Sequence, residues 1–133
     1  MNYTVIVPFY NEAKNISSFN NELINNLKKI NNEKRNLEIV YVDDGSNDET
    51  FNELKKLSTN TVDTLIVKHH TNLSQSTAIN TGIGQSKYEN IVIMDGDLQN
   101  DPNDLAKMVS EFEKGTDMLI GWRKHRKDNF FSR

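Results

Sequence analysis

Short apolar segments alternate along this chain with longer segments in which apolar residues recur at helical spacing. The apolar segments are interpreted as strands and cover residues 3–7, 37–42, 62–70, 90–97 and 116–123. Pro8 is expected to end the first strand, since proline lacks the N–H that a strand ladder needs. Alternating strands and helices favour an α/β fold, in which a mostly parallel sheet is covered by helices.

Right-handed crossovers would place the carboxyl ends of all these strands at one edge of the sheet. Open parallel sheets bind ligands outside that edge, especially where the strand order reverses. The polar segments that follow the strands are PFYNE, DDGS, KHHTN, DGDLQ and GWR. The sequence therefore predicts that its chemistry-bearing residues converge on one rim of a single domain, residues 1–133.

The first two helical segments follow from their apolar residues. One stripe of the first helix is formed by Ile16, Phe19, Leu23, Leu27 and Ile30. The apolar residues of the second helix are Phe51, Leu54 and Leu57. Ser46 or Asn47 is expected to cap this second helix, because both side chains can accept a hydrogen bond from a free backbone N–H.

Two further helices are expected nearer the carboxyl end. The third runs from about Ser74 to Gln85, and its small residues Ala78 and Gly82 suit close packing against the sheet. The fourth has Pro102 near its first turn, and Gly115 lies past its end.

Composition excludes several classes of protein. The 16 Lys and Arg against 19 Asp and Glu give a net charge of −3, so there is no global signature of nucleic-acid binding. The absence of cysteine excludes disulfides, zinc–thiolate sites and thiol catalysis. No signal peptide and no apolar run of transmembrane length is visible, so we expect a soluble chain. The basic segment WRKHRKDNFFSR is either solvated or a contact for an anion or a membrane surface.

The segment IVIMDGDLQNDP delivers a cluster of acids to the end of an apolar strand. Asp95 and Asp97 would face opposite ways on an extended backbone, but a turn at Gly96 can bring both toward one ligand. Carboxylate and amide oxygens are what a hard divalent cation prefers, and Mg²⁺ commonly shares its remaining positions with phosphates. Asp101 before Pro102 is expected to cap the helix that follows.

Two adjacent acids, Asp43 and Asp44, end the second strand. One interpretation is a turn held by local hydrogen bonds of the aspartate side chains. The other is that Asp44 accepts hydrogen bonds from a nucleobase or ribose, as acids at second-strand ends do in nucleotide-binding sheets. The residues alone leave both interpretations open.

Five segments occur in order and carry a resemblance to a known family: VIVPFYNE, IVYVDDGSND, NLSQSTAINTGI, IVIMDGDLQNDP and IGWRKHR. Together they resemble the amino-terminal part of a glycosyltransferase family 2 enzyme with the GT-A fold. Within that family the chain is most similar to the polyprenyl-phosphate glycosyltransferases, because DGDLQNDP matches the D-x-D-L-Q-x-x-P form of that subgroup.

The resemblance implies an inverting, membrane-associated transferase that moves a sugar from a UDP- or GDP-linked donor to a polyprenyl phosphate. It implies a Mg²⁺ or Mn²⁺ cofactor and a place in the cytoplasm, at the inner face of the cell membrane. An acceptor phosphate is already ionised, so it needs no strong general base. Arginine forks would hold such a phosphate better than lysine.

The resemblance also implies roles for individual residues. The nucleotide-sugar would be bound by Pro8, Tyr10, Asn11, Glu12, Asp43, Asp44, Gln75, Asp95, Gly96 and Asp97. The metal would be held by Asp95, Asp97 and Gln99, and the acceptor phosphate by Arg123, Arg126 and Arg133. The residues expected to be catalytic are Asp95, Asp97, Arg123 and Arg126.

The chain departs from the family pattern before its third helix. Where the family often has R-N-x-G-K, this chain has HTNLSQS, with Ser74 and Gln75 in place of Gly and Lys. One positive charge is therefore missing near the expected diphosphate. For His69 and His70 a surface or loop role is favoured over ligation.

Length is the second departure, because relatives of this kind continue past the position of Arg133. The alternative function is therefore a non-catalytic nucleotide-sugar-binding module, or one half of a split enzyme. A sheet edge left exposed would favour a complementary carboxy-terminal chain or a homo-oligomer. A nucleotidyltransferase is disfavoured, because such an enzyme would need a glycine-rich, basic loop after the first strand, and the loop PFYNEAKN contains no glycine.

Overall fold

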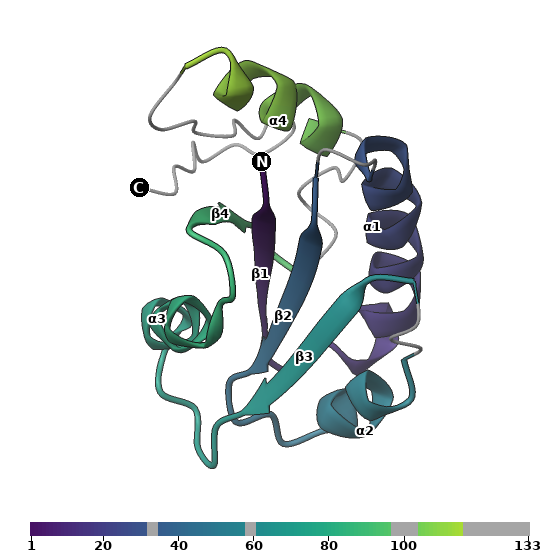
Figure 1. The fold of residues 1–133 in the computed structure, drawn as a ribbon. Helices are drawn as coiled ribbons and strands as arrows, with labels where there is room; N and C mark the ends of the chain where they lie inside the picture. The colour runs from purple at the N-terminus through teal and green to yellow at the C-terminus, as the bar shows by residue number, and fades with distance from the viewer. Residues whose placement is uncertain (32–34, 58–60, 97–103, 116–133) are drawn as a thin grey trace, which may run out of the picture.

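A four-stranded parallel sheet forms the centre of the computed structural model, which describes residues 1–31, 35–57, 61–96 and 104–115 (Figure 1). The strands are β1 (Tyr3–Phe9), β2 (Leu37–Asp43), β3 (Asp63–Lys68) and β4 (Asn90–Ile93), in the order β3-β2-β1-β4. The helices are α1 (Ile16–Ile30), α2 (Thr50–Lys55), α3 (Gln75–Gln85) and α4 (Leu105–Glu113), with a short 3₁₀ turn, η1 (Ala13–Asn15), before α1. The predicted alternation of strand and helix is confirmed.

The direction in which strands are added reverses once. β2 and β3 are laid down on one side of β1, and β4 returns to its other side. Because each right-handed crossover covers the face set by its direction, α1 and α2 lie on one face of the sheet and α3 on the other (Figure 1). The reversal falls between β1 and β4, which is where an open sheet of this kind binds ligands.

The two central strands are buried along their whole length, because helices cover both of their faces. On the face covered by α1, Val5, Val7 and Phe9 pack in one cluster with the predicted α1 stripe. The smaller cluster on the opposite face contains Ile6 and Ala78. All five predicted stripe residues of α1 are buried.

α3 packs unusually close to the sheet at Gly82, which is buried as predicted. A Cβ atom at this position would lie 2.6 Å from Cγ2 of Ile6, far inside ordinary contact distance. Glycine therefore sets the height of α3 over β1. The same helix carries Gly84, where a Cβ would meet nothing within 4 Å.

The prediction that Pro8 ends the first strand is wrong. β1 pairs with β2 through Pro8 and Phe9, and the N–H of Asp44 donates to the carbonyl of Phe9 at 2.9 Å. The carbonyl of Ile6 accepts from Met94, so alternation places the nitrogen of Pro8 on the β4 side. The nitrogen of Pro8 thus faces away from β2, and pairing with β4 has already ended at Ile6, so the missing N–H removes no ladder bond to either strand.

The prediction that Ser46 or Asn47 caps α2 is also wrong. α2 begins at Thr50, and its N-cap residue Glu49 makes no side-chain cap. The N–H of Thr50 instead donates to Asp48 at 2.9 Å. Ser46 and Asn47 bind the loop after β1, as described below.

Glu113, the last residue of α4, binds residues at the beginning of β1 and just before β2. Arg35 donates to both carboxylate oxygens of Glu113, at 2.9 and 2.6 Å, and the hydroxyl of Tyr3 donates at 2.7 Å. These hydrogen bonds lower the pKa of Glu113 to about 2. Gly115 follows α4 with a φ of +106°, as expected past its end. None of the helices in the described ranges is both long and apolar enough to cross a bilayer.

Candidate functional site

The carboxyl ends of β1 and β4 meet at the reversal of the strand order. Met94 lies in the core, and its N–H donates to the carbonyl of Ile6 at 3.0 Å. Gly96 packs directly on the ring of Phe9, where a Cβ would come within 2.0 Å of Cε1. Asp95, half-buried, stands between these two fixed positions. The core of the protein therefore fixes the backbone that presents the Asp95 carboxylate.

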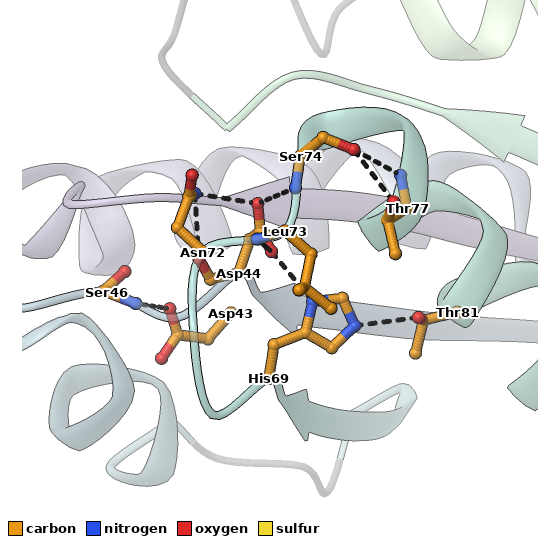
Figure 2. A network of polar contacts seen from close by, with 9 residues as sticks. All are labelled: Asp43, Asp44, Ser46, His69, Asn72, Leu73, Ser74, Thr77 and Thr81. Atoms are coloured by element: carbon orange, nitrogen blue, oxygen red, sulfur yellow. Dashed lines mark hydrogen bonds and ion pairs between the residues drawn. The ribbon is translucent and has the colours of Figure 1, made fainter.

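The Asp44 carboxylate is a hub that gathers the loop after β3 (Figure 2). Its Oδ1 accepts from the N–H of Leu73 at 3.0 Å, and its Oδ2 accepts from the N–H of Ser74 and the amide of Asn72, both at 3.0 Å. The side chain is only 4% exposed. Asp44 thus fastens residues 72–74 to the end of β2, immediately before α3 begins.

His69 completes this hub and links it to α3. Its Nδ1 lies 2.8 Å from Oδ1 of Asp44, and its Nε2 lies 2.8 Å from Oγ1 of Thr81 (Figure 2). An ionised carboxylate only accepts hydrogen bonds, so Nδ1 carries the hydrogen in this contact. The expected surface or loop position holds for His70, which is exposed. His69 also lies in a loop, the one after β3, as expected, but its side chain is only 10% exposed.

Gln75, the first residue of α3, reaches the acid at the end of β4. Its side-chain amide donates to Oδ1 of Asp95 at 2.6 Å. Ser74 is the N-cap of α3, and its Oγ accepts from the N–H of Thr77 at 3.1 Å. The backbone of Ser74 has a φ of +153°, a value that L-residues rarely adopt. The beginning of α3 is therefore bound to β2 through Asp44 and to β4 through Asp95.

The loop after β1 is bound to the loop after β2. Asn11 adopts a φ of +53°, its N–H donates to Oγ of Ser46 at 2.9 Å, and its side chain accepts from Asn47 at 2.9 Å. The N–H of Glu12 donates to Oγ1 of Thr50 at 2.9 Å. Tyr10, between Phe9 and Asn11, is 43% exposed. Hydrogen bonds thus join the two loops into one rim, on which Tyr10 is exposed.

Asp43 and Asp48 complete the acids of this rim. Asp43 is fully buried; its Oδ1 accepts from Ser46 at 3.1 Å, and its Oδ2 has no hydrogen-bond partner within the described residues. Burial would raise the pKa of Asp48, but hydrogen bonds from Thr50 and Ala13 outweigh it and lower that pKa below its ordinary value. The turn interpretation of the DDGS segment is confirmed for Asp43, whose side chain accepts from Ser46 three residues further on. The side chain of Asp44 accepts instead from the loop after β3, and the contact with a base or ribose stays a prediction.

The nucleotide-side residues predicted from the sequence lie in the last residues of β1 or β2, follow the ends of β1, β2 or β4, or begin α3. They are Pro8, Tyr10, Asn11, Glu12, Asp43, Asp44, Gln75, Asp95 and Gly96. Asp97, Gln99, Asp101, Arg123, Arg126 and Arg133 lie outside the described residues, as does the fifth predicted strand. Sequence reasoning missed Asn72 and Thr81. Their only signal was polar character in the segments after β3 and along α3, which is too common to single them out.

Only part of the expected metal site falls within the described ranges. There, no three His, Cys, Asp or Glu side chains gather closely enough to hold a metal ion by themselves. Asp95 offers carboxylate oxygens at the reversal point, which are donors that a hard divalent cation prefers. This residue fits the expected cofactor. A cavity of about 190 Å³ lies at the opposite edge of the sheet, where β2 and β3 begin, and is not part of this rim.

Comparison with known proteins identifies the family. The sequence pattern of Glycosyl transferase family 2 matches residues 4–133, which is nearly the whole chain. This chain belongs to glycosyl transferase family 2. The resemblance inferred from the five sequence segments is confirmed.

Several relatives of this family 2 chain are enzymes named for polyprenyl phosphates. It is 36% identical over 132 residues to a dodecaprenyl-phosphate galacturonate synthase of Rhizobium johnstonii, covering 98% of this chain and 38% of the relative. It is 31% identical to a dolichol-phosphate mannosyltransferase of Pyrococcus furiosus, covering 92% of this chain and 33% of that protein. The family 2 chain thus spans less than half the length of these relatives.

Solved structures of glycosyltransferases share its fold. The mannosyltransferase PcManGT of Pyrobaculum calidifontis, in complex with GDP-Man and Mn²⁺, is 29% identical with a TM-score of 0.65, over 80% of this chain and 31% of that one. S. aureus TarS in complex with UDP-GlcNAc is 27% identical with a TM-score of 0.65, over 86% and 31%. The family 2 chain therefore has the α/β arrangement of the GT-A fold, as predicted.

Proposed function

We propose that this chain is the nucleotide-sugar-binding domain, residues 1–133, of an inverting glycosyltransferase that uses a UDP- or GDP-linked sugar. The observation that carries this proposal is the placement of Asp95 and Gly96 against the end of β1, at the reversal of the strand order. A ligand bound there would lie between the β1 loop and the start of α3. Two structural relatives were solved with a UDP- or a GDP-sugar, which supports this donor class.

In the proposed site each side of the rim has a separate task. Tyr10 would offer an exposed ring for the base to stack on, and Asn11 and Glu12 would hold the loop that carries it. Asp44 would accept a hydrogen bond from the base or ribose, supported by Asp43, and Gln75 would lie beside the diphosphate. Pro8 is buried near the end of β1 and would keep the backbone that leads into this loop in place.

We propose Asp95, Asp97 and Gln99 as the oxygen ligands of a Mg²⁺ or Mn²⁺ ion. When bound, such an ion supplies electrostatic stabilisation of the charge that develops on the diphosphate leaving group. The presence of Mn²⁺ in the PcManGT complex supports this cofactor. The task of this chain's residues is to hold Asp95 at the end of β4 before the ion arrives.

The proposed acceptor is a polyprenyl phosphate, gripped by Arg123, Arg126 and Arg133. The names of the relatives, which include a dodecaprenyl-phosphate and a dolichol-phosphate enzyme, support this acceptor class. An acceptor of this kind is held in a bilayer, so the protein would work at the cytoplasmic face of a membrane. Paired guanidinium donors fit the planar recognition of phosphate oxygens.

Isothermal titration tests the donor site. UDP-GlcNAc and GDP-mannose are titrated into the chain with MnCl₂ and with EDTA. We expect one of the two to bind in the presence of Mn²⁺, and Asp95→Asn to weaken that binding at least tenfold. Asp63→Asn is the matched control, because it makes the same change on the exposed side chain of Asp63 at the other edge of the sheet. Absence of Mn²⁺-dependent binding by the wild type contradicts the proposal.

Turnover separates the enzyme from the alternative, a non-catalytic donor-binding module or one half of a split transferase. The chain is incubated with the sugar nucleotide that binds, MnCl₂ and a short polyprenyl phosphate, and release of the nucleoside diphosphate is measured. A complete enzyme forms the glycosylated lipid with an inverted anomeric carbon. Donor binding without any turnover assigns the chain to the binding-module class, and the acceptor side then requires a further segment or a partner chain.

A further inference from the structure

Within the part of the chain that the structure describes, the side chain of Gln75 belongs to neither apolar cluster, yet it makes a short polar contact. It is exposed on the first turn of α3, and its amide donates to Oδ1 of Asp95 at 2.6 Å. A hydrogen bond to a charged acceptor is shorter and stronger than a neutral one. Fixing a long, exposed glutamine side chain costs conformational entropy, so the contact offsets a real loss of freedom.

The backbone at Gln75 is itself held in place by hydrogen bonds to the end of β2. The residue before it, Ser74, donates its N–H to Asp44 and caps α3 through Thr77 (Figure 2). Further along α3, Thr81 is joined to Asp44 through His69. The backbone of Gln75 is therefore fixed to the end of β2, while its side-chain amide reaches Asp95 at the end of β4.

We infer that Gln75 is a positioning residue, which holds the Asp95 carboxylate in the orientation needed to ligate a divalent cation. This inference rests on the proposed function, because it assigns Asp95 to the metal. The backbone of Asp95 is already fixed between Met94 and Gly96, so the side-chain torsions are what Gln75 restrains. Hydrogen-bond partners that orient metal ligands change metal affinity by roughly 10–100-fold when they are removed.

The amide also suits this task electrostatically. A neutral donor orients the carboxylate and leaves its negative charge available to a cation. A lysine ammonium at the same place would form an ion pair with Asp95 and compete with the cation for that charge. Gln75 thus combines orientation with a full charge on the ligand, and the positive charge that the family pattern often has at this position is not needed for it.

Binding of Mn²⁺ tests the role without any turnover. MnCl₂ is titrated into the full chain in the presence of saturating UDP or GDP, whichever the wild type binds, and free Mn²⁺ is followed by electron paramagnetic resonance. Nucleotide affinity is measured separately in EDTA. Gln75→Met keeps the length of the side chain and removes the donor. Gln85→Met makes the same change at the exposed other end of α3 and is the matched control.

We expect Gln75→Met to raise the Kd for Mn²⁺ about tenfold, to raise the nucleotide Kd in EDTA by a clearly smaller factor, and to leave the unfolding midpoint unchanged. Gln85→Met should match the wild type in all three. In an Asp95→Asn background, Gln75→Met should have no further effect on Mn²⁺, because the two residues act as one unit.

Three results would overturn the inference. An unchanged Kd for Mn²⁺ in Gln75→Met removes the positioning role. A weaker nucleotide Kd in EDTA with unchanged Mn²⁺ affinity would make Gln75 a direct nucleotide contact. Additive effects of Gln75→Met and Asp95→Asn would separate the two residues. If the wild type binds no Mn²⁺, the proposed function fails with it; if only Gln75→Met is silent, the proposed function stands and this inference alone is lost.

Discussion

The close approach of α3 to β1 predicts opposite effects on stability for two glycines of α3. Gly82 has no room for a side chain, whereas Gly84 has. In Gly82→Ala the new methyl group would lie 2.6 Å from Cγ2 of Ile6, and 3.3 Å from its Cδ1. Ile6 is fully buried in the middle of β1, so it has little room to move away. Gly84→Ala places the same methyl group in open space on the same helix.

The magnitudes follow from two opposing effects. Alanine is better than glycine in a helix by about 1 kcal/mol, and this gain is common to both variants, though smaller for Gly84 near the helix end. Overpacking a core by one methyl costs about 1–3 kcal/mol. We expect Gly84→Ala to be more stable than the wild type by about 0.5 kcal/mol. Because an approach of 2.6 Å is a severe overlap, the upper part of the overpacking range, about 2–3 kcal/mol, applies to Gly82→Ala, which after the helix gain should be less stable by about 1–2 kcal/mol.

Urea denaturation followed by circular dichroism measures both free energies of unfolding, and thermal melts provide a second estimate. A difference of about 2 kcal/mol between the variants corresponds to roughly 6–10 °C in Tm for a chain of this size. Equal stabilities for Gly82→Ala and Gly84→Ala would refute the close packing of α3 on Ile6. The Ile6→Ala background is the internal check: removing the facing side chain should make Gly82→Ala stabilising, with a coupling energy of about 1 kcal/mol or more.

Three other predictions concern the loops and the pH dependence. Gly45→Ala should cost at least about 3 kcal/mol by urea denaturation, because its φ is +71° and a Cβ would lie 2.1 Å from the backbone of Thr71; a loss under 1 kcal/mol contradicts this. Ser74→Gly should be more stable than the wild type by about 0.5–1 kcal/mol, because it relieves the strain of a φ of +153° and glycine is nearly as good an N-cap; Ser74→Ala should be less stable than both. Arg35 and Tyr3 lower the pKa of Glu113 from 4.5 to about 2, so their contribution, discounted for partial exposure to about 1–2 kcal/mol, is present above pH 4.5 and lost as the pH falls toward 2. Glu113→Gln should therefore lose its deficit in unfolding free energy between pH 5 and about pH 2, and a deficit that persists at low pH would contradict the assignment.

The fold was predictable because its signal is carried by whole segments. Buried strands with apolar residues on both faces, separated by helices with one apolar stripe, leave few arrangements other than a covered parallel sheet. Pro8 shows where local rules stop. A proline ends a strand only if its missing N–H faces a partner, and which side a residue faces depends on the register with strands that lie 34 and more positions away.

The prediction of the N-cap of α2 was wrong for a related reason. Ser46 and Asn47 are good capping residues by type, but the loop after β1 competes for them through Asn11. Competition between a local and a distant partner is decided by tertiary geometry, which a sequence window does not contain. The same holds for His69, whose burial depends on Asp44 and Thr81, 25 positions before it and 12 after it.

The hub at Asp44 sets a condition on the proposed contact with a base. A carboxylate has about four lone-pair sites, and here His69, Asn72, Leu73 and Ser74 each donate to one of them. A base donor at Asp44 must therefore replace one of these groups. Replacing either backbone N–H would release the start of α3. Replacing His69 would leave its mostly buried imidazole without the hydrogen bond to Asp44. Asn72 is exposed, so its amide can return to water at the lowest cost. If Asp44 accepts from a base as proposed, we expect the amide of Asn72 to be the group that moves, because Asp44 then keeps the two backbone N–H groups that hold the start of α3 and Gln75.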